Sequence, residues 1–245
     1  MAKRTKRLTN PVEQDEIRIN KFLSEAGICS RREADRYIME GKVTIDGVVA
    51  QIGSKVKKDS VVTFCGKPVK REEKLVLIAF NKPVGIVCTT DPREPDNIID
   101  YIGYGSRIYP IGRLDKDSEG LILLTNDGNI VNKILRAEYR HEKEYIVTVN
   151  KEITSEFIKA MSSGVPILDT VTNPCKVKQL DKNTFNIILT QGLNRQIRRM
   201  CEYLGYRVTS LKRIRIMNIR LGRLKTGAWR NVTDKELEEL VKHFK

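Results

Sequence analysis

From residue 112 the chain reads Gly112-Arg113-Leu114-Asp115-Lys116-Asp117-Ser118-Glu119-Gly120-Leu121, and the apolar Ile122-Leu123-Leu124 follows before Thr125-Asn126-Asp127-Gly128. Consecutive apolar residues bounded by Gly and by an Asn-Asp-Gly turn predict a buried strand. The charged residues that precede the apolar run therefore lie in a loop at the start of that strand. A carboxylate held beside Arg113 and Lys116 at such a place indicates a reaction centre within a surface that binds polyanions.

The composition favours a nucleic-acid partner. The 245 residues include 45 Lys and Arg against 31 Asp and Glu, which gives a net charge of +14. The total charge fits RNA, DNA or an anionic membrane equally well. Residues 193–225, however, contain ten Arg or Lys and one acidic residue, Glu202. A solvated surface normally mixes both signs, so this segment favours contact with phosphates.

Several protein classes receive little support from the sequence. None of the five cysteines belongs to a Cys-x-x-Cys pair, so we expect reduced thiols. His141 and His243 are far apart and unaccompanied, and no metal site is expected. No apolar run approaches the length of a membrane span, and residues 1–7 lack the apolar core of a secretory signal. We therefore expect a cytoplasmic protein that does not bind membranes.

The N-terminal part predicts a small unit of two helices and a hairpin. Ile17–Gly27 has apolar residues at helical spacing and ends in Gly. Ser30 and Glu33 form a capping-box pattern that opens a second helix, which ends at Gly41. Val43–Val49 predicts a hairpin on an Asp-Gly turn.

We therefore divide the chain into a basic tail (1–16), a helix-helix-hairpin unit (17–66), a polar linker (67–74) and a second domain (75–245). The first unit offers cations for RNA on or near its second helix: Arg31, Arg32, Arg36 and Lys42.

The second domain mixes strands and helices without regular βαβ spacing. This order predicts an α+β fold with a mixed, largely antiparallel sheet flanked by helices. Thr233 and Glu236 form a second capping-box pattern, which predicts the last helix. The predicted strands are Leu75–Phe80, Leu121–Thr125, Tyr145–Val149, Cys175–Leu180, Phe185–Thr190 and Val208–Ile219, and the predicted helices are Asn129–Arg136, Ser155–Met161, Leu193–Leu204 and Asp234–His243.

The helix over Leu193–Leu204 places two neighbouring arginines differently. Its buried stripe consists of Ile197, Met200, Cys201 and Leu204. Helical phase puts Arg198 at the edge of that stripe and points Arg199 away from it. A half-buried guanidinium needs an anionic partner, and Asp115 is the candidate. From spacing alone, a structural salt bridge and a functional pair carry equal weight.

Two further side chains have alternative interpretations. Tyr145 starts a strand with alternating faces, where it is either a core aromatic or a stacking platform for a base. Asp117 and Glu119 follow Asp115 closely enough to suggest a magnesium site, although they are equally explained as surface carboxylates.

Five sequence stretches together resemble a known family. Residues 17–66 resemble the S4 RNA-binding domain. The second domain resembles the pseudouridine synthases of the RsuA/RluB/RluE/RluF group through Asn81–Gly85, Gly112–Gly128, Lys143–Tyr145 and Gly192–Met200. The version Gly-Leu-Asn-Arg-Gln-Ile-Arg-Arg-Met-Cys-Glu is most similar to RluF-type enzymes that act on large-subunit ribosomal RNA. The resemblance covers nearly the whole chain.

The resemblance implies an isomerase that converts a specific uridine of 23S ribosomal RNA to pseudouridine, with a tRNA as a candidate second substrate. It implies base flipping, no metal or organic cofactor, and a monomer. Asp115, Tyr145 and Arg198 would be the catalytic residues, with Arg198 keeping Asp115 ionised and oriented. Asp115 would either attack the sugar or take a sugar proton. The RNA contacts in this domain would come from Arg113, Lys116, Arg195, Arg199, Lys212, Arg213 and Arg215.

Two other functions compete with this interpretation. A non-catalytic S4-type ribosome-binding or assembly module leaves the second domain unexplained. A metal-dependent nuclease would use Asp115, Asp117 and Glu119.

Overall fold

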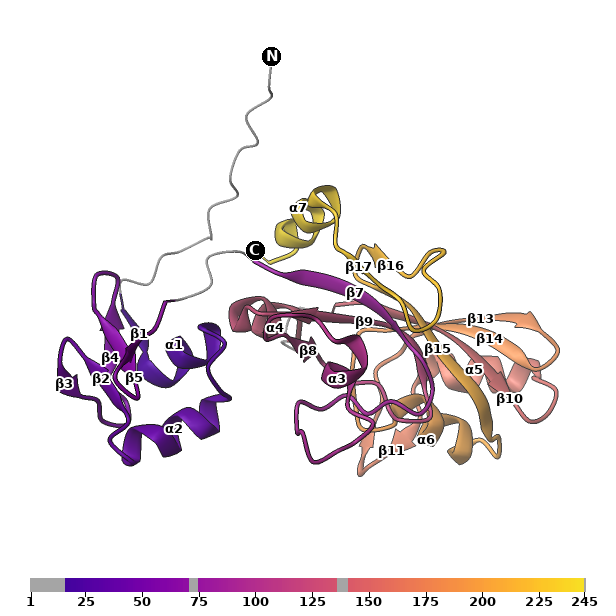
Figure 1. Ribbon diagram of the computed structural model, residues 1–245. Helices are drawn as coiled ribbons and strands as arrows, with labels where there is room; N and C mark the ends of the chain where they lie inside the picture. The colour runs from indigo at the N-terminus through magenta and orange to yellow at the C-terminus, as the bar shows by residue number, and fades with distance from the viewer. Residues whose placement is uncertain (1–15, 71–74, 136–140, 245) are drawn as a thin grey trace, which may run out of the picture. The chain divides into compact units, whose positions relative to one another are not determined.

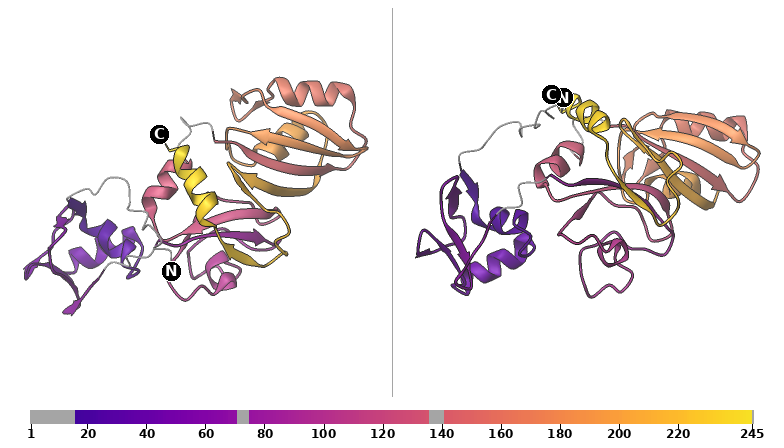
Figure 2. Two further views of the ribbon diagram at one scale, coloured as in Figure 1. Left: turned by 90° about the horizontal axis from the view of Figure 1, so that it is seen from above. Right: turned by 45° about the horizontal axis from the view of Figure 1, so that its top comes forward.

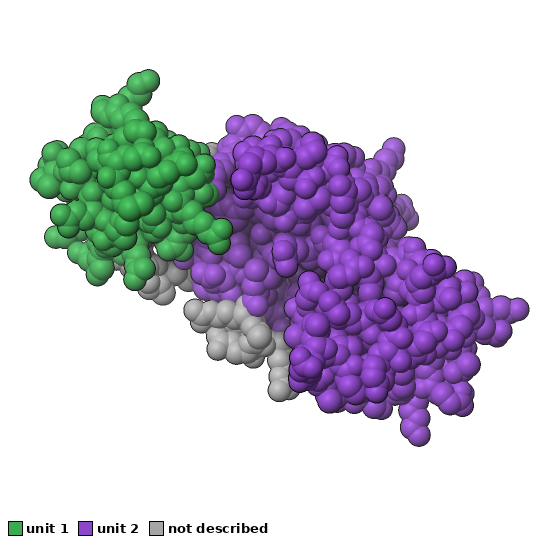
Figure 3. Space-filling view, turned by 90° about the horizontal axis from the view of Figure 1, so that it is seen from below, with its two compact units in different colours: residues 1–74 green, residues 75–245 purple. Residues whose placement is uncertain are grey.

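The computed structural model describes residues 16–70, 75–135 and 141–244. The chain divides into two compact units, Met1–Lys74 and Leu75–Lys245 (Figure 3). Almost all of the tail expected over 1–16 lies outside the described residues. Within the described ranges, no helix is both long enough and apolar enough to cross a membrane.

The first unit packs two helices against short strands (Figure 1). Strand β1 pairs with β4, and four strands form a sheet in the order β3-β2-β5-β6. Its core contains Leu23, Ala34 and Val43, which are fully buried. The elements are β1 (Glu16–Arg18), α1 (Ile19–Glu25), α2 (Arg31–Met39), β2 (Val43–Ile45), β3 (Val48–Val49), β4 (Lys55–Lys57), β5 (Val62–Phe64) and β6 (Lys67–Pro68).

Local signals in this unit are confirmed. Ser30 and Glu33 form the complete capping box at the start of α2. The β2–β3 hairpin turns at Asp46 and Gly47, whose φ values of 51° and 83° fit the turn that an Asp-Gly pair favours. The linker expected over 67–74 starts too early, because Lys67 and Pro68 form β6 and pair with β5.

The second unit is built on a sheet of nine strands, whose main order is β13-β14-β10-β15-β9-β7-β17. Every strand pair in it is antiparallel except β9 with β15, so the prediction of a mixed, largely antiparallel sheet is confirmed. The strands of this unit are β7 (Leu77–Lys82), β8 (Tyr109–Ile111), β9 (Glu119–Thr125), β10 (Lys143–Val149), β11 (Pro166–Ile167), β12 (Thr170–Val171), β13 (Lys176–Asp181), β14 (Thr184–Leu189), β15 (Val208–Ile216), β16 (Ile219–Arg220) and β17 (Trp229–Asn231).

Helices cover both faces of this sheet. On one face, side chains of α3, α5 and α6 pack into the larger core. On the other face, α4 and α7 contribute Ile130, Ile134 and Leu240. Because both faces are covered, consecutive residues of β9 are buried, which accounts for the unbroken apolar run 121–124. The helices are α3 (Ile98–Ile102), α4 (Gly128–Leu135), α5 (Ser155–Ser163), α6 (Gln196–Tyr203) and α7 (Asp234–Lys242).

The sequence missed the shortest elements of this unit. Helix α3 has five residues and β8 has three, including Pro110, so neither shows a usable period. The strand predicted to reach Ile219 ends at Ile216, because Met217 takes a left-handed conformation with φ 52° and the chain turns back as β16. The capping box that begins α7 is confirmed at Thr233 and Glu236.

The parallel contact between β9 and β15 joins two halves of the sheet (Figure 2). It consists of two residue pairs, Lys212 with Glu119 and Arg213 with Gly120. Gly120 has φ 106°, and a Cβ there would overlap the backbone of Arg213, 2.7 Å from its nitrogen. Only glycine permits this close approach of the two strands.

Candidate active site

Four residues form a row across the central strands at this junction. Strand pairing aligns Lys82 of β7 with Gly120 of β9, Gly120 with Arg213 of β15, and Arg213 with Tyr145 of β10. Directly paired residues project to the same face of a sheet. Lys82, Arg213 and Tyr145 therefore lie on one face, with the position of Gly120 between Lys82 and Arg213 free of a side chain.

The loop that carries Asp115 enters β9 beside this row. Its turn is closed by the amide of Ser118, which donates to the carbonyl of Asp115 at 3.1 Å. Leu114 is buried, and its amide donates to the Sγ of Cys88 at 3.4 Å. The amide of Gly85 donates to the carbonyl of Lys116 at 2.8 Å. These bonds fix the backbone of the loop on both sides of the Asp115 carboxylate.

Arg195 is the cation that pairs with Asp115. Its Nη1 lies 3.5 Å from Oδ2 of Asp115, and its Nη2 lies 3.2 Å from Oδ2 of Asp117. All three side chains are about half-exposed. Arg195 precedes α6 in a left-handed conformation with φ 49°. The carboxylate thus sits in a polar, partly solvated place with one guanidinium beside it.

The expected pair between Arg198 and Asp115 is wrong. Nη2 of Arg198 donates to the carbonyl of Asp117 at 2.8 Å and to the hydroxyl of Ser118 at 3.0 Å, and it lies 3.3 Å from the Asp117 carboxylate. The expected burial is confirmed, since the Arg198 side chain is 14% exposed. The turn after Asp115 brings the following residues, rather than Asp115 itself, to the edge of α6. Arg198 therefore holds the loop, and Arg195 holds the carboxylate.

Asp117 stays charged in this network. Burial opposes its charged form, but the hydrogen bond from Arg195 and the charges of Arg198 and Arg195 outweigh burial and lower the pKa of Asp117. The hydrogen bond to Asp117 in turn raises the pKa of Arg195. Sequence reasoning gave neither residue this role. Arg195 precedes α6 in a left-handed conformation, so helical spacing gave no signal for its role.

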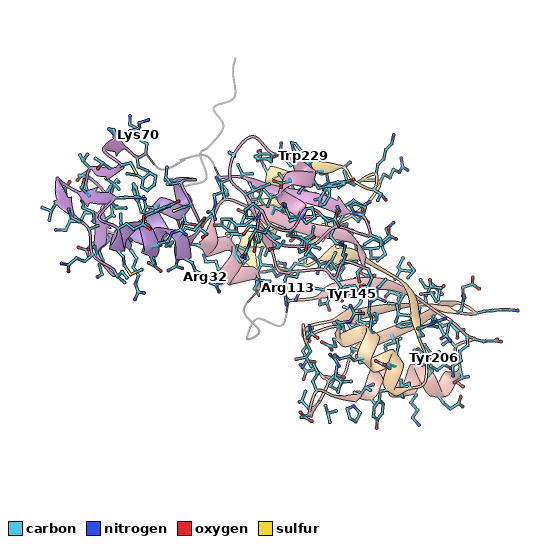
Figure 4. All side chains as sticks on the ribbon, turned by 60° about the horizontal axis from the view of Figure 1, so that its bottom comes forward. Arg32, Lys70, Arg113, Tyr145, Tyr206 and Trp229 are labelled. Atoms are coloured by element: carbon cyan, nitrogen blue, oxygen red, sulfur yellow. The ribbon has the colours of Figure 1, made fainter. Side chains whose placement is uncertain are left out.

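Tyr145 lies at the surface of the larger core. It is 9% exposed, and the Cζ of Arg213 lies 6.0 Å from the centre of its ring. Both interpretations of Tyr145 fit this place, because the ring belongs to the larger core and lies in the same row as Arg213 and Lys82. Figure 4 labels Tyr145 and Arg113 on this unit.

Lys82 is a fully buried cation that sequence reasoning left without a role. Its Nζ donates to the carbonyls of Pro83 and Ile86 at 2.8 and 2.7 Å. Burial is the main cause that lowers the pKa of Lys82, with a smaller effect in the same direction from Arg213, while Cys88 and Asp115 act in the opposite direction. An Asn-Lys-Pro at the end of a buried strand was the available signal, since a lysine there must enter the core.

The cations expected to bind RNA fall into two groups. Arg31 and Arg32 on α2, and Arg113 in the loop, are exposed. Figure 4 labels Arg32 on the first unit. Five others have carboxylate or amide partners: Arg36 and Lys42 with Glu40, Lys116 with Asp96, Lys212 with Glu119, and Arg199 with Asn194.

Two of these cations are not surface groups. Arg215 donates to Glu144, Glu142 and the carbonyl of Met217, so each of its nitrogens is bound within the protein. Arg213 is buried in the row described above. RNA contact by any of these cations stays a prediction.

Among the described residues, no group of three or more His, Cys, Asp or Glu side chains could hold a metal ion. Asp115 and Asp117 face Arg195.

Comparisons with known proteins agree with this geometry. A family model for RNA pseudouridylate synthase matches residues 76–203, and one for the S4 domain matches residues 17–62. The chain is 59% identical to the dual-specificity RNA pseudouridine synthase RluF of Escherichia coli (strain K12) over 228 residues, covering 92% of this chain and 79% of that protein.

The chain belongs to the RNA pseudouridine synthases. It is an RluF-type enzyme of the RsuA group with an N-terminal S4 domain. It is also 37% identical to the ribosomal large subunit pseudouridine synthase B of Bacillus subtilis (strain 168), covering 91% of this chain and 95% of that protein. A crystal structure of a pseudouridylate synthase matches with a TM-score of 0.68 and 29% identity, covering 91% of this chain and 99% of the other.

This assignment confirms the catalytic interpretation over the ribosome-binding module. The pseudouridine synthase isomerises uridine in RNA, and its S4 domain is an RNA-binding unit.

Proposed function

We propose that this synthase converts a specific uridine of 23S ribosomal RNA to pseudouridine, and that a tRNA is its second substrate. The relative from Bacillus subtilis is named for the large ribosomal subunit, and the relative from Escherichia coli is named dual-specificity. Such substrates place the enzyme in the cytoplasm. One chain supplies Asp115, Arg198 and Tyr145 to the junction of its sheet, and a monomer is therefore a sufficient catalytic unit.

The position of Asp115 is the observation that carries the mechanism. Its carboxylate is partly exposed, is paired with Arg195, and lies on a loop tied down at Leu114, Lys116 and Ser118. A fixed carboxylate can attack C1′ of the sugar, or it can take a sugar proton and so lead to a glycal. In both routes the C1′–N1 bond breaks, the base turns, and a C1′–C5 bond forms. As that bond forms, the bond between Asp115 and C1′ breaks in the first route, and the sugar proton returns in the second. Loss of the C5 proton and protonation of N1 complete the isomerisation.

Residues near Asp115 hold the flipped nucleotide. Tyr145 lies at the surface of the core, where the uracil ring stacks on the face of the tyrosine ring, and its hydroxyl assists removal of the C5 proton. Arg113 is exposed beside Asp115 and fills the space that the flipped base leaves. Arg198 is a positioning residue, because its bonds to Asp117 and Ser118 hold the loop instead of touching Asp115.

The S4 domain supplies phosphate contacts. Arg31 and Arg32 are exposed on the first turn of α2, and Arg36 follows on the same helix. Basic side chains along one helix bind phosphates without reading bases. This domain therefore contributes affinity and position, and the chemistry takes place in the other unit.

Modification mapping tests this function. The purified full chain is incubated in EDTA with 23S ribosomal RNA, 16S ribosomal RNA and tRNA transcripts, and pseudouridine is located by carbodiimide-dependent stops in primer extension. We expect stops in 23S ribosomal RNA and in tRNA, none in 16S ribosomal RNA, and intact strands. Asp115→Asn is the matched control, since it removes a charge while keeping the shape of the side chain. Stops confined to 16S ribosomal RNA would contradict the substrate assignment, and loss of all stops in EDTA would show a metal requirement.

A further inference from the structure

The row at the junction of the sheet contains two buried cations, Lys82 and Arg213. Among the described residues, neither forms an ion pair with a carboxylate. Lys82 is fully buried and is bound to carbonyl oxygens. Arg213 is 4% exposed, and its Nε donates to the carbonyl of Leu121 at 2.7 Å. Burying a cation without an anionic partner is costly. Proteins retain buried, unpaired charges at sites where the charge binds a ligand or takes part in catalysis.

One hydrogen-bond donor of Arg213 is unsatisfied among the described residues. Its Nη2 is buried and has no hydrogen-bond partner within the described part of the chain. Buried donors are nearly always satisfied, and an unsatisfied one beside a reaction centre indicates a group that pairs when substrate binds. Arg213 projects from the same sheet face as Tyr145, and its Cζ lies 6.0 Å from the centre of that ring. A base stacked on Tyr145 is therefore within reach of the guanidinium.

A positive group at this place would stabilise the charge that develops on the base during the reaction. When the C1′–N1 bond breaks, its electron pair leaves with the base, and negative charge spreads over N1, O2 and O4 of the uracil ring. This holds whether Asp115 forms a bond to C1′ or takes a sugar proton. A preorganised donor in a site that excludes water is most effective against charge that appears only as the bond breaks.

Resting on the proposed function, we propose that Arg213 is a catalytic residue that binds the flipped uracil. Its Nη2 donates a hydrogen bond to a carbonyl oxygen of the ring, O2 or O4, and opposes the negative charge that develops there. Lys82, on the other side of the gap at Gly120, adds a second positive charge to the same face. Arg213 was expected to bind phosphates, and its burial favours contact with the base instead.

Substitutions of Arg213 in the full-length enzyme test this role. Arg213→Met keeps an unbranched apolar chain but removes the charge and the donors, and Arg213→Lys keeps the charge. We expect the single-turnover rate of pseudouridine formation to fall about 100-fold in Arg213→Met and less in Arg213→Lys. RNA affinity should stay within about threefold of the wild type, because phosphate contacts dominate binding. Arg230→Met is the matched control, since it removes a half-buried arginine that pairs with Glu236 away from the row; its rate should equal that of the wild type.

Thio-substituted RNA separates a bond to the base from a structural role. Once the target uridine is mapped, substrates carrying 2-thiouridine or 4-thiouridine at that position replace one carbonyl oxygen by sulfur, a weaker acceptor. One of the two should slow the wild type about tenfold and leave the rate of the Arg213 variants unchanged, which also identifies the oxygen. Equal thio effects in wild type and variants, or a rate of Arg213→Met within threefold of the wild type, would overturn the proposal. A wild type that forms no pseudouridine in any RNA would instead contradict the proposed function.

Discussion

The two arginines at the start of α6 should differ in what they contribute to stability and to activity. Arg198→Ala removes a guanidinium that donates to the carbonyl of Asp117 and to the hydroxyl of Ser118. Ser118 is 1% exposed, so its hydroxyl would lose a partner that water cannot readily replace. Arg195→Ala removes a guanidinium whose side chain and partners are about half-exposed.

The expected free energies follow from these surroundings. A hydrogen bond from a charged donor contributes about 1.5–3 kcal/mol, and a buried hydroxyl left unsatisfied costs about 1–3 kcal/mol. The two terms describe one contact and do not add. The Nε of Arg198 is buried without a partner, so truncation also removes one unfavourable group. We expect Arg198→Ala to lower the free energy of unfolding by about 2 kcal/mol, and Arg195→Ala by about 0.5 kcal/mol.

When both variants are folded, Arg195→Ala should reduce the reaction rate more than Arg198→Ala does. Arg195 is the partner of the Asp115 carboxylate, so Arg195→Ala should reduce the single-turnover rate about tenfold at a temperature where both variants are folded. Arg198→Ala should act by loosening the loop. Arg198→Lys should recover little, because the Nζ of lysine falls short of the position of Nη2, the nitrogen through which Arg198 contacts Asp117 and Ser118.

Thermal unfolding and single-turnover assays measure the two effects separately. For a domain of this size, about 2 kcal/mol corresponds to a decrease in Tm of about 4–8 °C. If Arg195→Ala lowers Tm more than Arg198→Ala does, or if Arg198→Ala shifts Tm by less than about 1 °C, the division of roles between the two arginines is refuted.

Four further outcomes are expected. Asp115→Asn should abolish product while RNA affinity, measured by filter binding, stays within about threefold of the wild type; turnover by this variant would exclude Asp115 as the essential carboxylate. Tyr145→Phe keeps the ring and loses the hydroxyl, so it should bind RNA and react slowly, and a wild-type rate would leave Tyr145 as a stacking platform alone. Deletion of residues 1–66 should leave a folded catalytic unit, which circular dichroism can show. The truncated protein should bind RNA more weakly, and its affinity should depend less on salt concentration. An unchanged salt dependence would exclude the S4 domain as a source of phosphate contacts. Lys82→Met tests the effect of pH on stability. Because burial lowers the pKa of Lys82 below 10.5, the unfolded chain holds this proton more tightly, and wild-type stability should rise relative to the variant as pH increases from the folded pKa toward 10.5. A difference in urea midpoint that is constant between pH 7 and 10 would contradict the lowered pKa of Lys82.

Local signals in the sequence were sufficient for much of the fold. The capping boxes at Ser30 and Thr233 and the Asp-Gly hairpin depend on residues a few positions apart, and all are found in the structure. The buried stripe of α6 is also confirmed at Ile197, Met200 and Cys201. These features need only helix or strand geometry, which the sequence period reveals.

The choice of partner at the site could not be predicted in this way. Helical phase correctly placed Arg198 at the edge of the core, but Asp115 and Asp117 are two positions apart in one loop, and the turn closed by Ser118 decides which faces Arg198. Helix α6 begins at Gln196, and the left-handed backbone of Arg195 lies outside the regular phase. Both features depend on tertiary contacts.

The burial of Arg213 could not be predicted from the sequence either. In a segment with ten basic residues, the sequence suggested a single phosphate-binding surface. Strand alternation places Leu211 and Arg213 on the core face of β15, while Arg215, beyond an irregularity in the pairing with β10, binds Glu142 and Glu144. The alignment of Arg213 with Tyr145 connects residues 68 positions apart, and no local period contains that information.

The row at the sheet junction has a consequence for when the enzyme becomes active during its synthesis. Its members come from β7, β9, β10 and β15, so the chain must be made to about residue 216 before the last strand can enter between β10 and β9. Contacts between such distant segments form late in folding, because long loops must close first. A nascent chain whose S4 domain has already folded can bind RNA, but it has no place for a flipped base until β15 joins the sheet. Recognition therefore precedes catalysis in the life of each molecule, and a chain truncated before β15 would occupy RNA without modifying it.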